Sequence, residues 1–238
     1  PWPELGDPNV DQLLEELKKR HIPKLLEQTI WLGRKDAILR SQGKNALSDA
    51  TRIKNHFLIT DFTQVNESLL NEAKSAGFTT MKVKVGRDWK AETEWLNKIL
   101  RSYPFTCRLD FNSKGDLASL ERMFSHLVPG LKQKIEFVED PFPWDYDTWM
   151  DAAKIARLAL DQEYVNINWR ELTKELPFRV IVIKPARQDL EEVTRFALLK
   201  NLKMVITSSM DHPVGVVHAV RVAAELKKQH STQVLECG

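Results

Sequence analysis

Two lysines alternate with apolar residues in the short segment MKVKVG, residues 81–86. Because successive side chains of a strand point to opposite faces, Lys82 and Lys84 share one face, and Val83 and Val85 share the other. A solvated sheet face is the ordinary interpretation of such alternation. Two amines on one face also suit proton transfer, since a neighbouring ammonium favours the neutral form of the other. The adjacent strands must decide between these two interpretations.

Three carboxylates stand at the ends of three successive apolar segments. Asp110 lies in RLDFN, Glu139 in FVEDP and Asp161 in LALDQE. Each aspartate alone could cap the following helix, as acids commonly do at such junctions. Together, three converging carboxylates would repel one another strongly in a partly desolvated site. A divalent cation relieves this repulsion, and an all-oxygen ligand set favours one Mg²⁺ ion.

Further polar residues follow the later apolar segments. Lys184 stands between VIVI and Pro185, and a lysine in so apolar a setting normally has a partner. Ser208 and Ser209 end the segment MVITSS, where their hydroxyls could bind a carboxylate or keto group of a substrate. A turn or a helix cap is the equally simple interpretation of the two serines.

A regular alternation of strand and helix begins near residue 56 and must position these groups. Eight apolar segments alternate with segments of 3.6-residue periodicity, which predicts parallel strands joined by right-handed crossovers. We therefore expect an α/β fold, a modified (β/α)8 or TIM-like barrel, with reactive groups at the C-terminal ends of the strands. An open doubly wound sheet is the alternative, weakened by the lack of a glycine-rich turn after the first strand. The predicted strands are residues 57–62, 81–85, 107–111, 135–140, 158–163, 180–186, 204–209 and 233–238.

The first 55 residues have a different pattern. Residues 7–21 and 22–43 each predict a helix, and no strand is evident before residue 56. We expect residues 1–55 to form a truncated, mainly helical N-terminal capping region that is incomplete. Residues 56–238 are then expected to form the barrel domain.

Five motifs of the barrel region resemble those of the enolase superfamily. In chain order they are TMKVKVG, RLDFN, FVEDP, LALDQE and IVIKPA. Within the superfamily they are most similar to the muconate-lactonizing-type group, whose members carry a T-x-K-x-K strand and a lysine on the sixth strand. The resemblance implies that Asp110, Glu139 and Asp161 are the metal ligands.

The same resemblance implies roles for the lysines. Lys84 would be the general base, Lys82 its electrostatic neighbour, and Lys184 would face Lys84 across the substrate. The other predicted site residues are Arg108, Ser208 and Ser209 as substrate contacts, and Asn112 and Glu163 behind the ligands. The capping region departs from the family pattern because it lacks a β-rich part, and the loop after the sixth strand, ARQDLEEV, lacks glycine.

The implied chemistry starts with removal of a proton α to a carboxylate whose developing charge Mg²⁺ stabilises. Loss of hydroxide from a cyclohexadiene ring would follow. An N-acylamino acid racemase or dipeptide epimerase is the alternative enzyme, although VLECG lacks the expected Asp-x-Asp at the eighth strand. A catalytically silent barrel acting as a binding protein is the alternative of another class, and it would have no reason to keep all five charged motifs.

The overall composition sets the partners that we expect. The 238 residues carry a formal net charge of +2 and no long basic run, which excludes an electrostatic nucleic-acid binder. The two cysteines form no disulfide framework, and no apolar run approaches the roughly 18 residues needed to span a membrane. We therefore expect a cytoplasmic enzyme with a small-molecule carboxylate substrate. The sequence does not set the oligomeric state, and a monomer is compatible with it.

Overall fold

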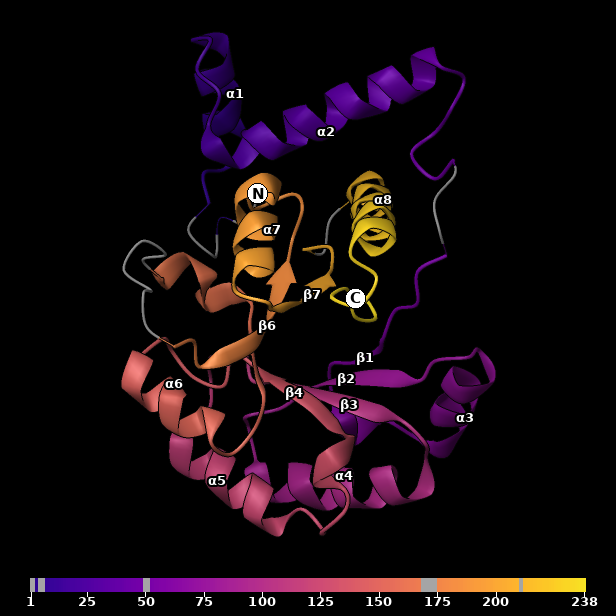
Figure 1. The fold of residues 1–238 in the computed structure, drawn as a ribbon, viewed down its shortest axis with the longest axis vertical. Coiled ribbons are helices and arrows are strands. Elements are labelled where there is room, and N and C mark those ends of the chain that lie inside the picture. The colour runs from indigo at the N-terminus through magenta and orange to yellow at the C-terminus, as the bar shows by residue number, and fades with distance from the viewer. Residues whose placement is uncertain (1–2, 4–6, 49–51, 168–174, 210–211) are drawn as a thin grey trace.

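A computed structural model describes residues 3, 7–48, 52–167, 175–209 and 212–238 of the chain. Its centre is a parallel sheet of seven strands that lie side by side in chain order, as the alternation of strands and helices predicts (Figure 1). The strands are β1 (Phe57–Ile59), β2 (Thr80–Lys84), β3 (Thr106–Asp110), β4 (Ile135–Glu139), β5 (Leu158–Leu160), β6 (Phe178–Ile183) and β7 (Lys203–Ile206).

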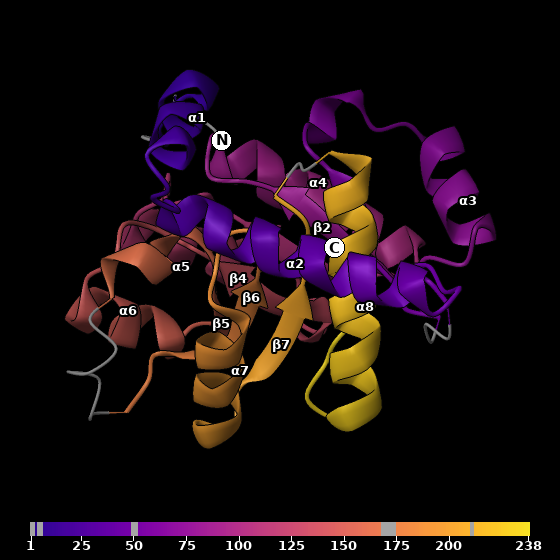
Figure 2. The ribbon, with the colours of Figure 1, turned by 90° about the horizontal axis from the view of Figure 1, so that it is seen from above.

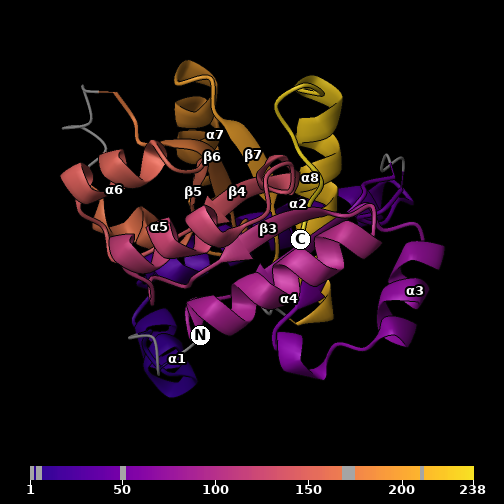
Figure 3. The same cartoon turned by 90° about the horizontal axis from the view of Figure 1, so that it is seen from below.

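Helices connect the strands and cover the outside of the curled sheet. Seen from below, α3 to α6 lie along the side formed by the first strands (Figure 3), and α7 and α8 cover the last ones (Figure 1). The helices after β1 are α3 (Glu67–Ser75), α4 (Trp89–Ser102), α5 (Leu117–His126), α6 (Tyr146–Ala153), α7 (Leu190–Leu199) and α8 (Pro213–Gln229). Short 3-10 helices are η2 (Phe62–Gln64), η3 (Lys132–Lys134) and η4 (Gln162–Asn166).

The two faces of the sheet bury separate apolar clusters. Val138 and Ile181 belong to the large cluster between the sheet and the helices. Their chain neighbours Phe137, Val180 and Val182 belong to a small cluster on the inner face. This alternation is what a parallel sheet curled upon itself requires, because successive side chains point to opposite faces. The inner face is also the one that carries Glu139, two residues after Phe137.

The last residues of the chain connect the two edges of the sheet. The predicted eighth strand, residues 233–238, is not a regular strand but makes two isolated parallel bridges, Met204 with Val234 and Asn55 with Cys237. The amide of Leu235 donates to the carbonyl of Met204 at 2.9 Å, and the amide of His56 donates to that of Cys237 at 2.8 Å. The structure thus has a seven-stranded curled sheet whose edges are bridged by this irregular segment.

Two helices precede the sheet. They are α1 (Val10–Lys18) and α2 (Lys24–Ser41), and the described part of residues 1–55 contains no named strand. The side chain of Asn9 caps α1 by accepting from the amide of Gln12, and the Gln12 side chain accepts from the amide of Asn9. Seen from above, α2 crosses over α7 and α8 (Figure 2).

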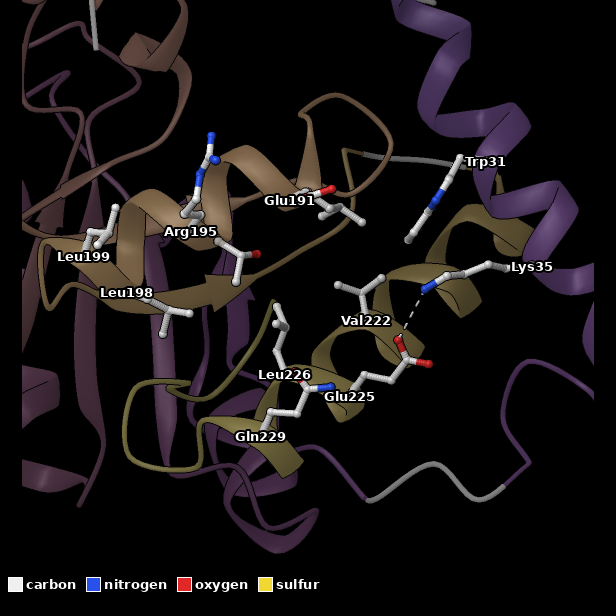
Figure 4. Close-up of a pocket in the computed structure, with 12 residues that line it drawn as sticks. Trp31, Lys35, Glu191, Arg195, Leu198, Leu199, Val222, Glu225, Leu226 and Gln229 are labelled. Carbon is white, nitrogen blue, oxygen red and sulfur yellow. Dashed lines mark ion pairs between the residues drawn. The ribbon is translucent and has the colours of Figure 1, made fainter. Parts of the chain in front are cut away.

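A largely apolar groove of about 620 Å³ lies between α2, α7 and α8. Trp31 and Lys35 of α2 face Val222 and Leu226 of α8 across it (Figure 4). None of the residues that line this groove is a predicted site residue. No helix in the described ranges is long and apolar enough to cross a membrane.

Candidate active site

The predicted catalytic groups lie at the C-terminal ends of neighbouring strands. Strand register pairs Lys84 of β2 with Asp110 of β3, and Asp110 with Glu139 of β4. Asp161 directly follows β5, and Lys184 directly follows β6. Because parallel strands bring their C-terminal ends to one edge, residues from five segments of the chain meet there. The structure therefore brings together the acids and lysines that the sequence motifs single out.

Lys82 is held by two of the acids. Its Nζ lies 2.9 Å from Oδ2 of Asp110 and 2.7 Å from Oε1 of Glu139, and its side chain is only 13% exposed. Burial disfavours its ammonium form, but the charges of Glu139, Asp110 and Asp161 outweigh burial and raise the pKa of Lys82 above its usual value. Lys82 is thus a fixed cation between the ends of β3 and β4.

The third acid is paired with Lys184. Nζ of Lys184 donates to Oδ2 of Asp161 at 2.7 Å, whereas Oδ1 of Asp161 is buried and accepts no hydrogen bond from the part of the chain that the structure describes. Burial opposes the charge of Asp161, but the ammonium groups of Lys184 and Lys82 lower its pKa. Burial and the neighbouring carboxylates of Asp110 and Asp161 raise the pKa of Glu139, although Lys82 acts in the opposite direction. The negative charge of Glu139 is therefore only partly compensated by Lys82.

Lys84 differs from the other two lysines. Its Nζ makes a long contact of 3.5 Å with the side-chain oxygen of Asn112, and it takes part in no ion pair among the described residues. Asn112 itself has a left-handed backbone, with φ of 47°, and its amide donates to Oδ1 of Asp110 at 3.0 Å. The hydrogen bond from the Asn112 amide to Asp110 is compatible with the predicted position of Asn112 behind the metal ligands.

The carboxylates fit a Mg²⁺ ion by their chemistry more than by their present arrangement. No group of three or more His, Cys, Asp and Glu side chains in the described ranges is arranged to hold a metal ion. The lysine amines instead occupy carboxylate oxygens of all three predicted ligands. However, a buried carboxylate oxygen without a partner, Oδ1 of Asp161, is costly unless a cation or donor satisfies it. An all-oxygen donor set is also what Mg²⁺ prefers.

Two acids near the ligands accept backbone amides from the loops. The Asp140 carboxylate accepts from the amides of Asp161, Gln162 and Glu163. Burial and the charge of Asp161 raise the pKa of Asp140 to about 7, against the effect of these amides. Asp140 was not among the predicted site residues, and its only signal in the sequence is its place in FVEDP between a predicted ligand and Pro141.

Glu163 joins three loops at the same end of the sheet. It accepts from the hydroxyl of Ser113, from the amide of Trp144 at 2.9 Å and from the side-chain amide of Asn166 at 2.8 Å. These donors follow β3, β4 and β5, the three strands that present the predicted metal ligands. The position predicted for Glu163, behind the ligands, is compatible with this contact set.

Arg108 lies elsewhere than a substrate contact requires. Its side chain is 1% exposed, and it lies on β3 two residues before Asp110. Its Nε donates to Glu136 at 2.7 Å, and its Nη1 lies 3.0 Å from Nδ1 of His56. A substrate contact by Arg108 does not fit this position, because the guanidinium is buried and bound by Glu136 and His56.

His56 beside Arg108 gives an expected pH dependence of stability. Burial and the positive charges of Arg108 and Lys82 lower the pKa of His56 to about 3. Since the unfolded histidine titrates near 6.5, only the unfolded state gains a proton between these values, and stability falls as the pH drops from 6.5 toward 3. Relative to pH 7, wild type at pH 4.5 should lose about 1–3 kcal/mol more than His56→Gln, because glutamine does not titrate.

Urea unfolding at the two pH values measures this difference. His21→Gln is the matched control, because the side chain of His21 is 67% exposed and the wild-type pH dependence should remain. Equal acid sensitivity of wild type and His56→Gln would show that His56 does not cause the loss.

The remaining predicted contacts are near the same edge of the sheet. Ser208 follows β7, and its carbonyl accepts from the Thr207 hydroxyl at 3.2 Å. A substrate contact by Ser208 or Ser209 stays a prediction.

Arg187, three residues after Lys184, forms a two-bond ion pair of 2.8 and 2.9 Å with Asp7. This pair ties the loop after β6 to the start of the described chain.

Comparison with known proteins places the chain in a family. A family model described as "O-succinylbenzoate synthase, N-terminal domain" matches residues 1–39. An o-succinylbenzoate synthase of Bdellovibrio bacteriovorus is 42% identical over all 238 residues, which correspond to 72% of that protein. The chain belongs to the o-succinylbenzoate synthase family. The resemblance to the enolase superfamily that the five motifs predict is thereby confirmed.

Solved structures support the fold. An o-succinylbenzoate synthase of Thermosynechococcus elongatus BP-1, complexed with Mg in its active site, matches with a TM-score of 0.58 and 22% identity. The match covers 79% of this chain and 61% of that one. A dipeptide epimerase of Enterococcus faecalis V583 matches equally well, with a TM-score of 0.60, 17% identity, and coverage of 79% and 56%. The chain thus spans less than two thirds of these solved relatives, and the fold does not distinguish the two activities.

Proposed function

We propose that this chain catalyses the reaction of an o-succinylbenzoate synthase, a hydro-lyase of menaquinone biosynthesis. The substrate would be 2-succinyl-6-hydroxy-2,4-cyclohexadiene-1-carboxylate, and the product o-succinylbenzoate. The 42% identity to the Bdellovibrio synthase across the whole chain supports this specific member of the superfamily.

The observation that carries the chemistry is the difference among the three lysines. Lys82 and Lys184 are each paired with a carboxylate, whereas Lys84 contacts, within the described ranges, only an amide oxygen at 3.5 Å. A lysine base must lose its proton, and an adjacent carboxylate would stabilise the protonated form. Lys84 is therefore the lysine best placed to act as the base, and Lys82 and Lys184 act as fixed cations.

The metal ligands would be Asp110, Glu139 and Asp161. When bound, Mg²⁺ supplies positive charge at the substrate carboxylate and so stabilises the negative charge that develops on its oxygens. Two observations support this assignment: Oδ1 of Asp161 has no hydrogen-bond partner among the described residues, and burial with the neighbouring carboxylates raises the pKa of Glu139. Lys82 would keep the carboxylates of Asp110 and Glu139 in place.

The proton steps belong to Lys84. Its neutral amine takes the proton from the ring carbon that carries the carboxylate, and the C–H electron pair moves onto the carboxylate oxygens. That pair then returns to form the new ring double bond as the C–O bond to the ring hydroxyl breaks. Expulsion of the ring hydroxyl, which the Lys84 ammonium protonates on the same face, gives water, the aromatic ring and the free amine again. Lys184 would provide a fixed positive charge near the ring. Each bond broken and proton moved is thus balanced without a further reactant.

We also propose the finer architecture that this function needs. The bridges of residues 233–238 to both edges of the sheet support closure into a (β/α)8-type barrel. Residues 1–55 would be the capping region and 56–238 the barrel domain. Helices α1 and α2 in the first of these segments support that division.

Incubation in deuterium oxide separates this proposal from a racemase. Wild type with Mg²⁺ is given the cyclohexadiene and, separately, an N-succinyl amino acid. The proposal predicts dehydration of the first substrate at a rate well above any racemisation of the second. Efficient racemisation and α-deuteration with negligible dehydration would instead assign the chain to the racemases.

A further inference from the structure

Asp161 starts the 3-10 helix η4 but does not cap it. It occupies the N-cap position of Gln162–Asn166, yet its side chain accepts no backbone amide there. At the other strand ends, acids in this position do cap: Asp88 accepts amides of α4, Asp116 of α5 and Asp189 of α7. The side chain at the N-cap position of η4 therefore does not accept the free amides at the start of this helix, as N-cap side chains normally do.

Asp140 supplies the missing cap from the neighbouring strand. Its Oδ1 accepts from the amide of Asp161 at 2.9 Å, and its Oδ2 accepts from the amide of Gln162 and, at 3.3 Å, from that of Glu163. Asp140 is 1% exposed, and its own amide donates to the carbonyl of Ala159 on β5 at 3.1 Å. Asp140 thus joins the end of β4 by hydrogen bonds to the residues before and after Asp161.

The backbone of Asp140 is held in an unfavourable conformation. Its φ is 38°, in the left-handed region, and the next residue is Pro141, which restricts the residue before it further. Such strain persists where the surroundings over-determine it. Here the carbonyl of Asp140 also accepts from the amide of Ser113, after β3, at 2.8 Å. Asp140 therefore connects the ends of β3, β4 and β5.

We infer that Asp140 is a positioning residue for Asp161 in the proposed metal site. Asp140 caps η4 where Asp161 would otherwise do so, and the Asp161 carboxylate therefore accepts no backbone amide of η4. Its Oδ2 accepts from Lys184, and its Oδ1 is buried with no hydrogen-bond partner among the described residues. Without Asp140, the amides of η4 would compete for that carboxylate. The inference rests on the proposed function, because it requires that Asp161 binds the metal.

A matched acid elsewhere in the chain provides the control. Glu92 is also 1% exposed and also accepts three backbone amides, from Gly86, Arg87 and Asp88 after β2. It organises a loop that presents no predicted metal ligand. Glu92→Gln should therefore lose a similar set of contacts without changing the affinity for metal.

The test is Mn²⁺ binding to the metal-free chain, followed by electron paramagnetic resonance, for wild type, Asp140→Asn, Asp140→Gly and Glu92→Gln. Asparagine and glycine both tolerate a positive φ, so either variant removes the carboxylate charge with little added backbone strain. We expect both Asp140 variants to raise the Kd about 10- to 100-fold, the usual cost of losing an outer partner of a ligand. Cooperative thermal unfolding identifies which variants are folded.

The outcomes separate the two proposals. A wild-type Kd retained by either folded Asp140 variant, or an equal loss of affinity in Glu92→Gln, overturns the positioning role while leaving the metal site in place. Absence of Mn²⁺ binding by wild type overturns the proposed metal site and, with it, this inference.

Discussion

Replacing Lys84 by arginine should lower kcat for dehydration by at least about 10²- to 10⁴-fold, the usual contribution of a general acid–base group. Arginine keeps the positive charge but does not lose its proton at accessible pH. The proposed reaction needs a neutral amine at this position to take the α-proton and an ammonium to return it to the leaving hydroxyl. Loss of the cyclohexadiene and formation of o-succinylbenzoate can both be followed to measure kcat.

Lys184→Arg is the matched control for Lys84→Arg. Lys184 is paired with Asp161 at 2.7 Å, and a guanidinium can replace that ion pair. If Lys184 is only a fixed cation, the variant should keep measurable dehydration, limited by the size of the new side chain. In a racemase, by contrast, both lysines transfer protons, and both arginine variants should fail to racemise. Full dehydration by Lys84→Arg would contradict its assignment as the base.

Glu139→Gln should abolish Mg²⁺-dependent activity and the rise in melting temperature that millimolar Mg²⁺ causes in wild type. A ligand bound only by the folded state stabilises it, and the variant loses the central carboxylate of the proposed site. The metal-free variant should melt no lower than metal-free wild type. The reason is that Glu139 is fully buried among Asp110, Asp161 and Asp140, which raise its pKa together with burial.

Glu136→Gln is the control on the same strand. Glu136 accepts from Arg108 at 2.7 Å and is not one of the proposed ligands, so this variant should lower stability but keep the Mg²⁺-induced shift. Melting curves with and without Mg²⁺ for the two glutamine variants provide the comparison. Wild-type activity in Glu139→Gln would remove Glu139 from the ligand set.

The strands were predictable because their signal is local. The predicted strands 107–111 and 135–140 agree with β3 and β4 within one residue at each end. Chain order and parallel pairing then placed Lys84, Asp110 and Glu139 side by side. What the sequence could not predict is the pairing of charges across strands. Lys82 contacts two acids, while Lys84 contacts none of the acids that the structure describes. This difference depends on side-chain directions that only the curled sheet sets.

The supporting residues were the hardest to predict. Asp140 accepts backbone amides from the segment that follows the next strand, and Glu92 accepts those of the loop before its own helix. Contacts to backbone amides leave no mark in the sequence. Arg108 was assigned to the substrate only through the resemblance of RLDFN to the family motif. A residue two positions before Asp110 lies further inside the sheet, where Glu136 and His56 contact it, and the motif carries no information on this depth.

Metal-dependent turnover of the cyclohexadiene carboxylate tests the central claim most directly. The chain is freed of metal with a chelator, and formation of o-succinylbenzoate is measured before and after Mg²⁺ is added. The proposed site predicts no formation above the rate without protein until Mg²⁺ is present, and catalytic turnover afterwards. No product at saturating Mg²⁺, or the same enzymatic rate with and without the metal, would contradict the account.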